Sequence, residues 1–215
     1  MRFFRNLSGL AAAVVLLASG LCGAASAAQK TAARSAPVPF AGAIDVGEET
    51  STPWGWLDFC NRHERECRGG LARPVDVTLT PRAWKLIQEV NARVNAMIEP
   101  LSDMAHWGVV DRWDLPDDGY GDCEDYVLLK RKLLIAAGLP RQAALVTIVK
   151  DEKGEGHAVL TVKTSRGDFV LDNMREGVRA WNEFPYRFVK RQSQSDPNVW
   201  VQIGEPTSAP LTVSR

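Results

Sequence analysis

The stretch Gly119-Tyr120-Gly121-Asp122-Cys123-Glu124-Asp125-Tyr126 places a cysteine where a helix is expected to begin. The helix should span about residues 122–137, because Gly138 and Pro140 stop it. The dipole and the unpaired backbone N–H groups of a first helical turn favour a thiolate and are suited to stabilise an oxyanion. The alternative is a buried structural cysteine. We expect the acidic, glycine-rich surroundings to keep Cys123 from being buried.

Three apolar segments rich in β-branched residues follow this helix, at about residues 143–150, 157–164 and 168–172. Turn-forming stretches at 151–154 and 165–167 separate them, which predicts consecutive antiparallel strands. A helical part that carries the cysteine, followed by such a sheet, indicates an α+β fold.

A second helix is expected upstream, where Thr80-Pro81 places proline at the first helical position. Apolar side chains recur at helical spacing from there until Pro100, and we expect this stripe to pack in the core. Its members are Trp84, Ile87, Val90, Val94 and Ile98. Residues 102–119 should form an irregular connection between the two helices.

His157 opens the second predicted strand and Asp172 closes the third. Taken singly, each has an ordinary structural explanation. The order cysteine, histidine, aspartate matches the need for a nucleophile, a base and a group that fixes the tautomer of the base. A tight turn at Arg166-Gly167 would place Asp172 opposite Thr161, about 13 Å along the strand from His157. A direct hydrogen bond would then require a longer loop or a bulge.

The motif at 121–126, with His157-Ala158-Val159-Leu160 and Leu171-Asp172-Asn173 downstream, resembles the bacterial transglutaminase-like cysteine proteinases. The resemblance extends from Trp54 to about Arg191. It implies a papain-like fold in which the helix of the nucleophile packs on an antiparallel sheet. It also implies a catalytic triad of Cys123, His157 and Asp172.

The same resemblance implies calcium dependence, through Asp122, Glu124 and Asp125, as in the adhesin-cleaving members of the family. The residues alone support calcium less strongly. Carboxylates supply the hard oxygen ligands that the ion prefers, but their spacing is not that of a twelve-residue calcium loop. The alternative is that acidic residues here complement the helix dipole.

The resemblance implies a cysteine endopeptidase acting on a protein, with a surface adhesin as one substrate class and an inner-membrane receptor as one regulatory partner. Acyl transfer of the transglutaminase type would use the same triad. A non-catalytic periplasmic binding protein of the same fold is a further alternative. The 26 basic and 26 acidic residues balance, so nucleic acid is not an expected partner.

The N-terminus resembles a secretory signal, with Arg2 and Arg5 before an apolar run and the sequence Ala25-Ser26-Ala27 at the cleavage site. The run is too short to span a bilayer stably, because a spanning helix needs about 20 apolar residues. Lipoprotein processing at Cys22 is disfavoured by Leu21. We therefore expect a periplasmic protein with a signal peptide at 1–27, a flexible leader at 28–52, a peptidase domain at 53–205 and a tail at 206–215.

Cys60 and Cys67 lie close together in a chain expected to reach an oxidising compartment, which predicts a local disulfide. A zinc site that includes His63 is the alternative, but it lacks a fourth good ligand at ordinary spacing.

Overall fold

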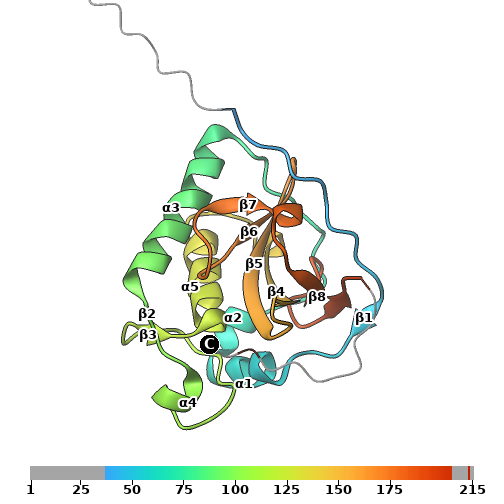
Figure 1. Cartoon of the computed structure of the whole chain (residues 1–215). Coiled ribbons are helices and arrows are strands. Elements are labelled where there is room, and N and C mark those ends of the chain that lie inside the picture. Colours follow the sequence, from blue (N-terminus) through green and yellow to red (C-terminus); the bar gives the residue numbers. More distant parts are fainter. Residues whose placement is uncertain (1–36, 205–212, 214–215) are drawn as a thin grey trace, which may run out of the picture. The chain divides into compact units, whose positions relative to one another are not determined.

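The computed structural model describes residues 37–204 and Val213, so the expected signal peptide and Cys22 lie outside the described residues. Helices pack on a seven-stranded sheet of order β1-β9-β8-β4-β5-β6-β7, in which all neighbouring strands are antiparallel (Figure 1). The strands are β1 (Glu49–Thr50), β4 (Ala144–Lys150), β5 (Gly156–Thr164), β6 (Gly167–Leu171), β7 (Val178–Ala180), β8 (Arg187–Gln192) and β9 (Trp200–Gln202). The predicted α+β fold is confirmed.

The helices are α1 (Trp54–Arg62), α2 (Glu64–Cys67), α3 (Pro81–Met97), α4 (Asp103–His106) and α5 (Cys123–Ala136). Two short parallel strands, β2 (Glu99–Pro100) and β3 (Tyr120–Gly121), bracket the segment that contains α4. Figure 1 shows α3 and α5 side by side against the sheet. Among the described residues, no helix is long and apolar enough to cross a membrane.

The starts of α3 and α5 are set by their caps. The Thr80 hydroxyl accepts a hydrogen bond from Ala83 N at 3.1 Å, and Pro81 occupies the first helical position. Ile87 and Val94 of α3 are fully buried, as the helical stripe predicts. Asp122 is the N-cap of α5, so that Cys123 is the first residue of its first turn.

The alternation of side chains in the central strands separates two layers of core. Ala158 and Leu160 of β5 join the larger cluster, which contains Ile87 of α3 and Val127 of α5. Val159 points to the other face. That face is covered by a smaller cluster consisting of Ile44, Val149, Val170, Phe184, Phe188 and Ile203.

The turn between β5 and β6 differs from the expected one. Its two residues are Ser165 and Arg166, and Gly167 already pairs with Thr164. Gly167 has φ +101°, and a Cβ there would collide with the carbonyl of Gly42, so only glycine fits. The pairing extends from there to Leu160–Leu171 without an irregularity. The predicted pairing of Asp172 with Thr161 was therefore wrong by two residues, and neither a longer loop nor a bulge is needed.

Residues 37–52 are not a flexible leader, contrary to the sequence-based prediction. Ala41 N donates to Arg166 O at 2.8 Å, and Ile44 N donates to the buried Asp168 carboxylate at 3.0 Å. Glu49 and Thr50 form β1 at the edge of the sheet. The segment lacks periodicity because it lies across the sheet as a single extended chain. Val213 of the predicted tail is likewise buried in the core.

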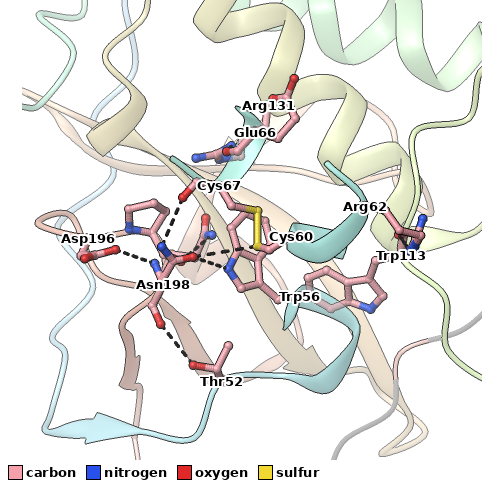
Figure 2. The surroundings of a disulfide bond; sticks show 12 residues. Thr52, Trp56, Cys60, Arg62, Glu66, Cys67, Trp113, Arg131, Asp196 and Asn198 are labelled. Atoms are coloured by element: carbon pink, nitrogen blue, oxygen red, sulfur yellow. Dashed lines mark hydrogen bonds between the residues drawn. A yellow bond between two sulfur atoms is a disulfide. The ribbon is translucent and has the colours of Figure 1, made fainter. Parts of the chain in front are cut away.

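Cys60 and Cys67 form a disulfide that joins α1 to α2, and Cys123 is free. His63 does not join them in a metal site, since its Nε2 lies 2.7 Å from Asp114 Oδ1. Figure 2 shows Asn198 beside this disulfide, where its amide accepts from Trp56 Nε1 at 3.1 Å and donates to Cys67 O at 3.2 Å. Asn198 therefore links α1 and α2 to the segment just before β9.

Replacing both bridging cysteines, Cys60→Ser with Cys67→Ser, should lower the free energy of unfolding by about 2 kcal/mol, because so short a loop constrains the unfolded chain only modestly. Denaturant unfolding followed by tryptophan fluorescence measures this difference. Peptide mapping of the unreduced protein should find this pair and a free Cys123. A disulfide that contains Cys123 would contradict the assignment.

Candidate active site

Cys123 is fully buried, so the expectation that its acidic neighbours would keep it from burial was wrong. The neighbours are themselves buried: Asp122, Glu124 and Asp125 are each at most 2% exposed. Their burial is tolerated because polar groups donate hydrogen bonds to the buried carboxyl oxygens. Asp125 Oδ1 accepts from Asp114 N at 2.7 Å, and Glu124 Oε2 accepts from the Cys123 thiol at 3.1 Å.

His157 lies at the start of β5 and its side chain is fully buried. Its Nε2 is 2.8 Å from Asp172 Oδ1, the direct contact that the expected strand register had left in question. The other nitrogen, Nδ1, is buried and makes no hydrogen bond of good geometry with the described residues. The Cys123 sulfur nevertheless lies near enough to interact with the ring. The structure thus brings together all three residues of the expected triad.

Asp172 also forms hydrogen bonds with groups other than His157. Tyr186 donates its hydroxyl to Oδ2 at 2.6 Å, and Met174 N donates to Oδ1 at 3.0 Å. The amide of Asn95 in α3 donates to the backbone carbonyl of Asp172 at 2.8 Å. These contacts fix the carboxylate after the end of β6.

The ionisation of the pair follows from these contacts. Burial lowers the pKa of His157, but its hydrogen bond to Asp172 and its interaction with Cys123 outweigh burial and raise the pKa to about 10. Burial raises the pKa of Asp172, yet the bonds from His157, Tyr186 and Met174 leave that pKa below its ordinary value. The arrangement favours an imidazolium next to a carboxylate.

Sequence reasoning missed Tyr186 and Asn95, which contact Asp172. Tyr186 stands in an irregular stretch before β8, and Asn95 lies among polar positions of an amphipathic helix. Neither has a sequence signal, because each acts only through its position in the folded chain.

The acidic residues of the first turn of α5 belong to a larger cluster. Two groups of carboxylates have ligand atoms within 4.8 Å of one another: Asp103, Asp111 and Glu124, and Asp103, Asp122 and Asp125. The sequence prediction contained Asp122, Glu124 and Asp125 but missed the other two, which lie in the irregular connection. Four of these side chains are buried and Asp111 is half-buried, and together the five form what we call the buried acidic cluster beside Cys123.

The carboxylates of this cluster raise one another's proton affinity. Burial, reinforced by Asp122, raises the pKa of Asp125 to about 8, although hydrogen bonds from Asp114 N and Asp122 N oppose this. Burial and the neighbouring Cys123 raise the pKa of Glu124 well above its ordinary value. Glu124 Oε1 is buried and has no hydrogen-bond partner among the described residues. A bound cation would satisfy such oxygens and offset their charge, so these residues fit a hard metal ion.

The family model for bacterial transglutaminase-like cysteine proteinases matches residues 46–208, and the chain belongs to this family. It is a family of cysteine proteinases.

Among solved structures, the chain is similar to LapG of Legionella pneumophila. The calcium-bound form is 22% identical with a TM-score of 0.48, over 58% of this chain and 73% of that protein. A second LapG structure is 23% identical with a TM-score of 0.48, over 55% and 68%. The form treated with EGTA is 20% identical with a TM-score of 0.45, over 60% and 70%. No curated protein sequence gives a significant match.

The substitution Asp172→Asn should lower the pKa of His157 by at least about one unit, because it removes the negative charge and leaves only a neutral amide oxygen as acceptor. An NMR titration of the imidazole resonances measures the change. His63 and His106 contact Asp114 and Asp118 instead, so their resonances are the internal control for an unchanged fold. An unchanged curve for His157 would contradict the assigned role of Asp172.

This pair also makes stability depend on pH. The folded-state pKa of His157, about 10, lies above the ordinary value of 6.5, so its contribution to stability is complete below pH 6.5. The contribution is lost as pH rises through 10. Asp172→Asn should therefore flatten the decrease in melting temperature between pH 6.5 and 10.

Proposed function

We propose that the chain is a cysteine endopeptidase in which Cys123 is the nucleophile, His157 the general base and acid, and Asp172 the group that orients His157. The observation that carries the proposal is the 2.8 Å contact between His157 Nε2 and Asp172 Oδ1, which leaves Nδ1 for the buried Cys123 at the head of α5. Membership of a cysteine proteinase family supports it.

In this mechanism the Cys123 proton is already on His157, in keeping with the raised pKa of the imidazole, and the thiolate attacks the carbonyl carbon of a peptide bond. The backbone N–H of Cys123, at the positive end of α5, supports the oxyanion. His157 then gives the proton to the departing amine, and the acyl group stays on sulfur. A water molecule, deprotonated by the now neutral His157, hydrolyses the thioester, and the sulfur leaves as the thiolate beside the imidazolium. Asp172 and Tyr186 hold the imidazole orientation throughout.

Access of a substrate to this thiol requires movement, because Cys123 is fully buried in the structure. The adjacent connection between β2 and β3 includes exposed apolar side chains, among them Met104, Trp107 and Val110. We infer that this connection moves when a polypeptide binds.

Cys123→Ala and His157→Ala should each reduce peptide cleavage by about 10³-fold or more, since each removes a participant in the covalent step. Asp172→Asn should reduce it roughly 10²- to 10⁴-fold and leave a measurable remainder. Cleavage assays on variants with unchanged circular dichroism measure these losses. Cleavage that persists in Cys123→Ala would refute the mechanism.

Two assays separate the alternatives. Incorporation of a labelled primary amine into a glutamine-containing peptide, faster than hydrolysis, would instead indicate a transglutaminase. Failure of the wild-type thiol to react with a peptide-like electrophile would favour a non-catalytic binding protein. Comparing surface and periplasmic proteins from cells with wild-type enzyme and with Cys123→Ala would identify the natural substrate, for which a surface adhesin in a periplasmic setting is our proposal.

We also propose that the buried acidic cluster binds calcium. Asp103, Asp111, Asp122, Glu124 and Asp125 would hold the ion, which would supply positive charge beside the nucleophile. Without it, the carboxylates next to Cys123 oppose a thiolate electrostatically. The chain's own residues do the chemistry, while the neutralised cluster keeps the first turn of α5 in place.

Calorimetric titration of chelator-treated protein should detect calcium binding, and Asp122→Asn or Glu124→Gln should weaken it at least about tenfold, because each removes a charged ligand. Asp117→Asn, an exposed acid of the same connection, is the matched control and should bind as wild type. Magnesium should bind poorly, since it demands a smaller octahedral shell. Full turnover without detectable calcium uptake would contradict this proposal, and the acidic residues would then serve only to cap the helix.

A further inference from the structure

Arg131 of α5 is a buried cation without a matching anion. Its side chain is among the largest fully buried ones. Its Nε donates to Ala144 O at 3.1 Å and its Nη1 to Glu66 O at 3.4 Å, both neutral carbonyls. Nη2 is buried and has no hydrogen-bond partner among the described residues. No described carboxylate lies within 4 Å of this guanidinium.

A second cation lies beside it. Arg141 donates to the same carbonyl oxygen of Glu66. Burial and the charge of Arg141 lower the pKa of Arg131 to about 9, and the Glu66 carboxylate offsets only part of this. That carboxylate also pairs with Lys132 at 3.9 Å. Arg131 and Arg141 thus share one backbone carbonyl of Glu66, and Figure 2 shows Arg131 and Glu66 in the surroundings of the disulfide.

Both arginines line a small cavity. Its volume is about 30 Å³, and its other walls include Gln142, Ser193 and Ser195. No acidic residue lines it. A single water-sized sphere needs about 10–15 Å³ of such space, so the cavity accepts a monatomic ion and excludes bulky organic anions.

We propose that this cavity binds a small monovalent inorganic anion, chloride being the probe we would use, between Arg131 and Arg141. Among the described residues, the Arg131 charge is offset at close range only by two carbonyl oxygens and by the Trp56 ring, whose centroid lies 5.7 Å from Cζ, so an anion here would supply the missing opposite charge. The hydroxyls of Ser193 and Ser195 bond to each other at 2.8 Å and offer one free proton to the same space. The ion would join Arg131 of α5 to Arg141 and to the residues that follow β8.

The test is thermal unfolding of the protein in chloride and in gluconate at constant ionic strength. Gluconate is too large for the cavity, so a specific site predicts a higher melting temperature in chloride. The rise should saturate, reaching about 3–6 °C at a chloride concentration tenfold above its dissociation constant. Bromide, which is also monatomic, should substitute for chloride.

Arg141→Gln should abolish the saturable response, whatever it does to the melting temperature itself. Arg82→Gln is the matched control, because Arg82 is exposed on α3 and does not line the cavity. Equal melting temperatures of the wild type in chloride and gluconate would overturn the proposal. The cavity would then hold water and no specific anion. An Arg141→Gln protein that responds to chloride as the wild type does would also overturn it.

Discussion

Burial of the first turn of α5 is the constraint on which the candidate site depends. A helix N-terminus in water would have its N–H groups and acidic side chains solvated, whereas here Asp122, Cys123, Glu124 and Asp125 are almost wholly enclosed. Each carboxyl group must then accept a hydrogen bond, carry a proton or bind a cation. Gly121 makes the enclosure feasible, since a Cβ there would lie 2.6 Å from Asp125 Oδ2. The thiol consequently shares its surroundings with the acidic cluster, and its reactivity depends on how that charge is offset.

The sheet supplies the other half of the site. β5 and β6 pair so that Asp172 leaves the ladder diagonally across from His157, and the contact needs no distortion of either strand. Tyr186 reaches the same carboxylate from the segment before β8, and Asn95 reaches its backbone from α3. Four separate parts of the chain therefore fix one imidazole, which is the kind of support a base needs to keep a single orientation.

Local signals in the sequence were sufficient for α3, α5, the disulfide and the three consecutive strands, because caps, helical stripes and short turns act over a few residues; α1, α2 and α4 were not predicted. The register of the β5–β6 hairpin was misjudged because Gly167 can stand in the turn or in the strand, and here it stands in the strand, paired with Thr164. Asp103, Asp111 and Tyr186 had no local signature, since their roles arise from pairing between distant segments. The burial of Cys123 was missed for the same reason: its cover comes from the fold and not from its neighbours in sequence.

The pairing of β1 with β9 has a consequence for how the molecule forms. Glu49 lies opposite Val201, a separation of 152 residues (201 minus 49), so this edge of the sheet joins the two ends of the described domain. Closing so long a loop costs chain entropy before any contact repays it, and such pairings slow folding. During synthesis β1 emerges first but has no strand to pair with until almost all of the domain has left the ribosome. The segment before α1 is thus the earliest part to be made and among the last to acquire its native contacts.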